Sequence, residues 1–126
     1  MPEIRPESIA PPAANYAHAV LTESATRWLH TSGVVPVDGN GSTPDGIAEQ
    51  AEVVWANLAA ILTDANMAPS DIVSVTTYVV VGEALGPVMA ARDSALDGHR
   101  AASTLVTVPA LARPEWRVEV AIVAAK

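Results

Sequence analysis

Residues 72–81 have the sequence IVSVTTYVVV, and this is the clearest β-strand of the chain. Valine, isoleucine, threonine and tyrosine make up nearly all of it, and these side chains favour an extended backbone because they pack well on a pleated sheet. Gly82 follows directly and ends the run. The stretch therefore predicts a strand, and the segments on either side of it indicate what the strand packs against.

Helical periodicity occurs on both sides of this strand. Apolar residues between Ile47 and Ala65 recur at the helical spacing, so one face of this segment is expected to pack on a sheet. Thr43 is the expected N-cap, with Pro44 at the first helical position, where a missing N–H is harmless. Pro87 is expected to open a second helix that extends to about Leu96.

The remaining segments predict further strands. Residues 1–15 contain four prolines and are expected to form an extended arm. Residues 16–21 and 28–35 have strand-like composition with a polar turn between them, which predicts an antiparallel hairpin. Two more strands are predicted at residues 101–108 and 116–124.

The predicted order is β-β-α-β-α-β-β. Mixed strands and helices with a hairpin first favour an α+β fold in which both helices pack on one face of a mixed sheet. The chain has 126 residues, enough for one domain with one core, and no internal repeat or linker is visible. Residues 1–126 are therefore expected to form a single domain.

Composition narrows the possible functions. The chain has 14 acidic and 7 basic residues, a net charge of −7, so nucleic acid is not an expected partner. It has no cysteine, which excludes disulfides and thiolate catalysis. No signal peptide is visible, and the apolar stretches are far shorter than the roughly 20 residues that span a membrane. A cytoplasmic protein without membrane contact is expected.

The apolar half of the composition is mostly alanine and valine, with no phenylalanine. Such small side chains leave apolar surface that a partner subunit could cover. The three histidines, His18, His30 and His99, are not accompanied by a second histidine at ligand spacing or by a carboxylate cluster. Structural or surface roles are therefore expected for them, and no metal site is predicted.

Four stretches in order along the chain carry a family pattern. They are residues 15–20 (NYAHAV), residues 31–36 (TSGVVP), residues 49–51 with 57–58 (EQA and NL), and residues 101–104 with 118–120 (AAST and VEV). They resemble the segments Pro-Tyr-Ser-x-Ala-Val, Ser-Gly-Gln-Ile-Pro, Glu-Ala-Gln…Asn-Ile/Leu and Pro-Ala-Arg-Ser-Thr…Val-Glu-Ile of the RidA/YjgF family. The resemblance covers nearly the whole chain.

This resemblance implies a chorismate-mutase-like fold and a homotrimer that binds small molecules in clefts between neighbouring subunits. It also implies hydrolysis of reactive imines or enamines, such as those formed from dehydrated serine or threonine, to a keto acid and ammonia. The family uses no metal or organic cofactor for this reaction, so none is expected here.

Glu119 matches the glutamate that orients the attacking water in the family. Its side chain is expected to share a strand face with Arg117 and Ala121, opposite the apolar side chains of the same strand. A carboxylate can hold and polarise a water beside an iminium carbon. The alternative is a solvated glutamate or an ion pair with Arg117.

Three further residues match the family's cleft. Ser32 precedes Gly33 at a strand end, where a hydroxyl and free backbone N–H groups can bind a carboxylate or a water. Ser32 is therefore a second catalytic candidate, and a turn serine is the alternative. Tyr16 matches the tyrosine that lines the cleft, or else it is a core aromatic.

Ala102 departs from the family, whose arginine at this position binds the substrate carboxylate through two hydrogen bonds. Ser103 and Thr104 follow it and remain candidates for substrate binding. Arg100 could compensate, because two residues upstream on a strand it would share the face of Ala102. Alternatively, the enlarged pocket takes a larger or less acidic substrate. Arg92 and Met89 also replace the tyrosine and asparagine that are common in the family.

Three functions remain open. The first is hydrolytic deamination of an imine or enamine with altered specificity. The second is non-catalytic binding of a small metabolite or partner by the trimer, and the third is different chemistry on the same scaffold.

Overall fold

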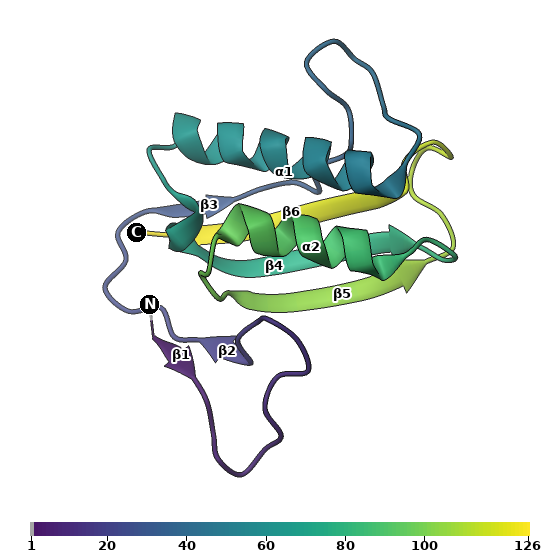
Figure 1. Cartoon of the computed structure of the whole chain (residues 1–126). Coiled ribbons are helices and arrows are strands. Elements are labelled where there is room, and N and C mark those ends of the chain that lie inside the picture. The colour runs from purple at the N-terminus through teal and green to yellow at the C-terminus, as the bar shows by residue number, and fades with distance from the viewer. Residues whose placement is uncertain (1) are drawn as a thin grey trace.

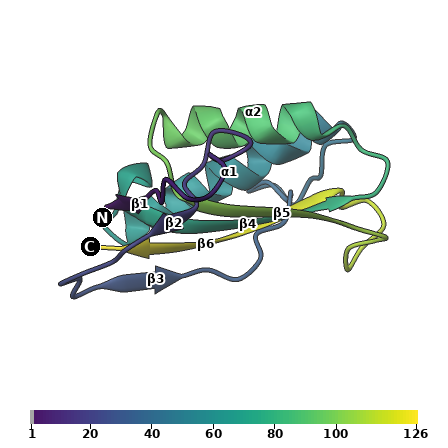
Figure 2. The same cartoon turned by 90° about the horizontal axis from the view of Figure 1, so that it is seen from below.

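The computed structural model describes residues 2–126 and has two layers, a four-stranded sheet and two helices on one of its faces (Figures 1 and 2). The main elements are β3 Trp28–His30, α1 Ile47–Asp64, β4 Ile72–Val80, α2 Leu85–Leu96, β5 Ala102–Val108 and β6 Val118–Ala125, with a 3-10 helix at Pro69–Asp71. The sheet order is β3-β6-β4-β5, in which only β4 and β5 are parallel. The predicted α+β class, with a mixed sheet and both helices on one face, is confirmed.

The strand predicted from IVSVTTYVVV is β4, and it has a partner on each side. Thr77 is paired with Leu105 of β5 and with Val120 of β6. α2 connects β4 to its parallel neighbour, since a parallel pair needs a crossover. This helix begins at Leu85, two residues before the predicted Pro87.

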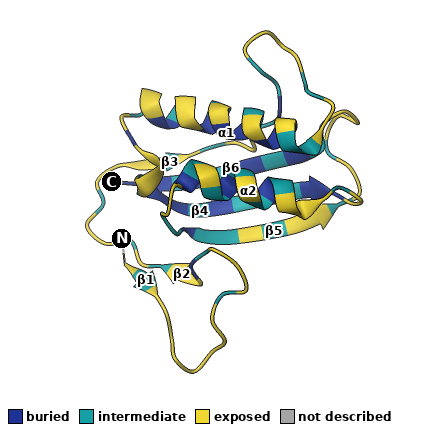
Figure 3. Cartoon of the chain, in the orientation of Figure 1, coloured by how far each residue is buried: buried dark blue, intermediate teal, exposed yellow. Residues whose placement is uncertain are grey.

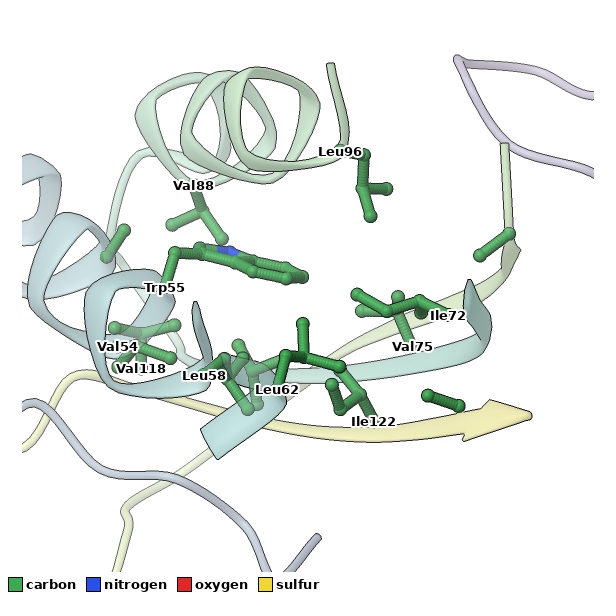
Figure 4. Close-up of a cluster of buried hydrophobic side chains, with 14 of the residues drawn as sticks. Val54, Trp55, Leu58, Leu62, Ile72, Val75, Val88, Leu96, Val118 and Ile122 are labelled. Atoms are coloured by element: carbon green, nitrogen blue, oxygen red, sulfur yellow. The ribbon is translucent and has the colours of Figure 1, made fainter. Parts of the chain in front are cut away.

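The core lies between the sheet and the helices. Val54, Leu58 and Leu62 of α1 are at most 2% exposed and pack toward Val75 and Ile122 of the sheet (Figure 4). The outward sides of both helices are exposed (Figure 3). No helix within residues 2–126 is both long and apolar enough to cross a membrane.

The predicted hairpin between residues 16–21 and 28–35 is wrong. β2 (Ala19–Val20) pairs with β1 (Glu3–Ile4) in a separate two-stranded sheet, and β3 pairs with β6. The proline-rich arm folds back on β2, beside the main sheet (Figure 1). β2 has only two residues and could form few hydrogen bonds with β3. The longer β6 instead provides backbone hydrogen-bonding groups along the whole length of β3.

The first helix also begins later than predicted. Its N-cap is Gly46, not Thr43, and no side chain caps it. The carbonyl of Pro44 accepts a hydrogen bond of 2.8 Å from the Nε2 of Gln50, which holds that residue outside the helix. Oε2 of Glu49 lies 2.0 Å from where a Cβ on Gly46 would stand, so the Glu49 carboxylate lies at the start of the helix. Its negative charge interacts favourably there with the positive end of the helix dipole.

Candidate functional site

The sheet face opposite the helices is open, because no helix of residues 2–126 covers it (Figure 2). Successive side chains of a strand point to opposite faces, and the buried ones mark the helix side. The open face carries Ser74, Thr76, Tyr78, Ala102, Thr104, Val106, Glu119, Ala121 and Val123. Val118, Val120 and Ile122 are buried on the helix side, as predicted from the alternation around Glu119.

Glu119 lies on this open face without a protein partner. Its carboxylate makes no hydrogen bond or ion pair with any residue that the structure describes. The alternative of an ion pair with Arg117 is wrong, since Nε of Arg117 is 2.8 Å from Oε1 of Glu83. The Glu119 side chain instead lies against Gly33: a Cβ there would be 1.9 Å from its Oε2. A half-buried, unpaired carboxylate is available to bind water.

A strap formed by residues 31–34 runs along β6 and brings Ser32 and Gly33 to Glu119. Val34 exchanges backbone hydrogen bonds of 2.7 and 3.1 Å with Val120. At its other end, Thr31 donates its N–H to the carbonyl of Ile122 and accepts from that residue's N–H through Oγ1 at 2.9 Å. Between these anchors, Ser32 and Gly33 are exposed and make no backbone hydrogen bonds within residues 2–126. Their N–H groups and the Ser32 hydroxyl are therefore free to bind a ligand.

The other predicted site residues lie elsewhere on the chain. Ala102 and Thr104 share the open face with Glu119, but β4 separates their strand from β6. Two strand spacings put them about 10 Å away across the sheet. In the register, Ala102 is opposite Ser74, whereas Glu119 is opposite Tyr78, which adds about 13 Å along the strands. One chain therefore does not bring these residues to Glu119.

Arg100 and Tyr16 lie near the start of β5, with Ala102 and Thr104, and these four residues form a second group of predicted site residues. Ala17 bridges to β5, with its N–H 3.0 Å from the carbonyl of Ala101. Arg100 donates through Nη2 to the carbonyl of Tyr16 and to Oε1 of Glu3 at 3.1 Å. Its guanidinium thus fastens the N-terminal segment to the start of β5.

Ser103 faces the helices, on the side of the sheet opposite to Ala102 and Thr104. Its hydroxyl lies 3.4 Å from Nη1 of Arg92, which is only 5% exposed. Sequence reasoning noted the unusual Arg92 but missed its burial. A signal was present, because Val88, Arg92 and Leu96 follow one another at intervals of four and so form one stripe of α2, and all three are buried.

Two polar residues within the family pattern position the site from behind the sheet. Gln50 is 1% exposed, donates at 2.8 Å to the carbonyls of Pro44 and Glu115, and accepts from the N–H of Arg117 at 2.8 Å. It therefore fixes the chain just before Glu119. Asn57 donates at 2.9 Å to the carbonyl of Val37, beyond the strap. Gln50 and Asn57 therefore hold the segments around the site in place, and they are not expected to contact a ligand.

No group of histidine, cysteine, aspartate and glutamate that could hold a metal occurs among residues 2–126. Two histidines make backbone contacts: Nε2 of His18 is 2.6 Å from the carbonyl of Ala10, and Nε2 of His99 is 2.6 Å from that of Ile72. The third, His30, stacks on Trp28.

The open sheet face, the strap and Glu119 can be compared with known proteins. The sequence model of the family Endoribonuclease L-PSP matches residues 7–126. The chain belongs to this family, the Rid/YjgF family. Its structure is similar to that of YyfB from Yersinia pestis, of the conserved Rid family, with 31% identity, 99% and 98% of the two chains covered and a TM-score of 0.89.

A second Rid/YjgF structure, that of the yjgF gene product from E. coli, is 25% identical and has a TM-score of 0.73 over 100% of this chain and 99% of that one. The expected chorismate-mutase-like fold of the Rid/YjgF family is therefore confirmed. No curated protein matches the sequence.

Proposed function

We propose that the chain is a hydrolytic deaminase of reactive enamine or imine intermediates, with a substrate specificity altered by Ala102. The observation that carries the proposal is the unpaired Glu119 carboxylate on the open sheet face, packed against Gly33 and beside the free N–H groups of the strap. Family membership supports it, because the resemblance implies this role for this glutamate.

The proposed reaction adds water to a C=N bond. Glu119 accepts a proton from a water whose oxygen bonds to the imine carbon, as the C=N electron pair moves to nitrogen. Glu119 returns this proton to the nitrogen, which gives a neutral carbinolamine. The carbinolamine then collapses: its hydroxyl proton passes to the leaving nitrogen, the C–N bond breaks, a carbonyl forms and ammonia leaves. The Ser32 hydroxyl and the N–H groups of Ser32 and Gly33 are suited to stabilise the negative charge that develops on the carbinolamine oxygen as it loses its proton. This chemistry requires no metal or organic cofactor.

We further propose that the enzyme is a cytoplasmic homotrimer with its substrate in clefts between subunits. The predicted site residues form two groups too far apart in one chain. The first group is Glu119, Ser32 and Gly33, and the second is Tyr16, Arg100, Ala102 and Thr104, whereas Ser103 faces the helices and lies outside both groups. A neighbouring copy that covers the open face would bring its second group to the first group of this chain. A closed ring of copies repeats this contact around its axis.

Specificity follows from the second group. Ala102 has neither charge nor donor, and Arg100, two residues upstream, is already bonded to Glu3 and Tyr16. A substrate carboxylate at this place would lose a charge pair, which costs on the order of 2–5 kcal/mol. The pocket is therefore proposed to accept a larger or less acidic imine than the usual α-imino acid. Ribonuclease activity, which the family name mentions, is not proposed because the net charge is −7.

The test is ammonia release from imines generated in the assay, one derived from a small α-amino acid and one from a neutral amine. Wild-type protein should accelerate release from the neutral imine, and Glu119→Gln should abolish the acceleration. Glu52→Gln, which changes an exposed glutamate on α1, is the matched control and should keep full activity. Equal rates for wild-type and Glu119→Gln protein would contradict the proposal.

A further inference from the structure

The second group adjoins a cavity between α2, β5 and the N-terminal segment. It has a volume of about 210 Å³ and is lined by Ala14, Tyr16, Leu85, Met89, Arg92, Ser103 and Leu105. Its walls are mainly apolar, and its polar groups are the guanidinium of Arg92 and the hydroxyls of Tyr16 and Ser103. One buried charge within an apolar cavity is typical of a site that fixes a ligand by a single ionic group.

Arg92 has more donors than the protein uses. A guanidinium carries five N–H groups. Nε donates to Oδ1 of Asp93 at 3.1 Å, and Nη1 makes a long contact of 3.4 Å with Oγ of Ser103. Nη2 lies 3.0 Å from the same Asp93 oxygen but forms no hydrogen bond with any described residue, although it is buried. Unbonded donors at 5% exposure are costly, so an acceptor is expected at this guanidinium.

The position of Asp93 determines which part of the guanidinium is free. Asp93 lies on the edge formed by Nε and Nη2. The end formed by Nη1 and Nη2 is left, and two parallel N–H groups there match the two oxygens of a carboxylate. Ser103 stands beside Nη1 and can add a further donor.

From this geometry we propose that the Arg92 cavity binds the carboxylate of a small, otherwise apolar acid. The guanidinium end and Ser103 hold the carboxylate, and Leu85, Met89 and Leu105 contact the hydrocarbon part. A volume of about 210 Å³ favours a small ligand with a short hydrocarbon part. Arg92 thereby supplies an anion site from α2, on the other side of β5 from Ala102. The site shares Tyr16 with the second group but does not include Glu119, so carboxylate binding there can be measured whether or not the protein is a deaminase.

Arg100 is the other arginine nearby with an unbonded buried atom, its Nε. Its Nη2 already holds Glu3 and the carbonyl of Tyr16, its side chain is 30% exposed, and it does not line the cavity. It therefore does not compete for the same ligand.

The test uses 3-methylbutanoate, a small branched acid, and its neutral isostere 3-methylbutanamide, titrated by calorimetry into the 126-residue chain. The carboxylate should bind, and the amide should bind at least about tenfold more weakly, because it lacks the charge that strengthens the hydrogen bonds. Arg92→Met should lose at least about tenfold in affinity for the carboxylate. Arg113→Met, which removes the same charge from an exposed position, should bind like the wild type.

Absence of carboxylate binding, equal binding of the amide, or unchanged binding by Arg92→Met would each overturn the proposal. Circular dichroism checks that the Arg92→Met variant is folded. If the Arg92→Met variant does not fold, amide NMR spectra of the wild-type protein with and without 3-methylbutanoate locate the binding site instead. The carboxylate should shift the resonances of Arg92, Ser103 and Leu105, and shifts confined to other residues would overturn the assignment.

Discussion

Gly33→Ala should impair catalysis far more than stability, because the new methyl group meets the Glu119 carboxylate. A Cβ at this position would lie 1.9 Å from Oε2, 2.6 Å from Cδ and 2.9 Å from Cγ of Glu119. Ordinary contact begins near 3.4 Å, so the carboxylate end must move by more than about 1 Å. The moved atoms belong to the end of a flexible side chain, and Gly33 is not among the glycines with positive φ.

The two expected magnitudes differ clearly. A strained or changed Glu119 rotamer costs about 0.5–1.5 kcal/mol of stability. A displacement of about 1 Å of a catalytic group costs roughly a hundredfold in rate. The kcat/KM for ammonia release should thus fall about a hundredfold, while urea unfolding should show a loss of less than about 2 kcal/mol.

The control for this substitution is Gly39→Ala, in the loop that follows the strap, where a Cβ would meet nothing within 4 Å. It should behave like the wild type in both assays. In the Gly33→Ala, Glu119→Gln double variant, the rate should be no lower than in Glu119→Gln alone, since both changes act on one carboxylate. Wild-type activity in Gly33→Ala, or additive losses in the double variant, would refute the reasoning.

Three further variants test other parts of the account. Gln50→Leu should destabilise the protein by about 2–4 kcal/mol in urea unfolding, because it removes three part-buried hydrogen bonds, to the carbonyls of Pro44 and Glu115 and from the N–H of Arg117. An unchanged midpoint would contradict the positioning role. Ala102→Arg should raise activity on carboxylate-bearing imines by tenfold or more relative to neutral ones, and no change in that ratio would show that the cleft does not include this residue. Val106→Asp puts a charge on the open face, where this side chain is 39% exposed, and should give monomers in light scattering, whereas an intact oligomer would place the interface elsewhere.

Elements with strong local patterns could be predicted from the sequence. The run from Ile72 to Val81 corresponds to β4, which lies inside the sheet. The helical spacing from Ile47 to Ala65 predicted the C-terminal end of α1 to within one residue. The alternation around Glu119 placed that side chain on the correct face. Each of these follows from a periodicity of 2 or 3.6 residues within one segment.

Features that depend on distant segments could not be predicted. Residues 16–21 and 28–35 both have strand composition, but composition does not state the partner, and β6, nearly 100 residues away, pairs with β3. The anchoring of Arg100 to Glu3 likewise depends on where the N-terminal segment folds, and so does the Arg92 cavity, which Ala14 and Tyr16 help to line. The cap at Gly46 was missed because the Gln50 hydrogen bond to Pro44 overrides the local preference of threonine.

The central claim is that two neighbouring subunits build one site around Glu119, and subunit mixing tests it most directly. Glu119→Gln removes the carboxylate from the first group, and Ala102→Trp fills the pocket at the second. Each variant alone should be inactive on the neutral imine. After the two are unfolded together and refolded, about a quarter of the clefts would combine the two intact groups by chance, so about a quarter of the wild-type ammonia release should return. No activity above that of the separate variants would contradict a site shared between subunits.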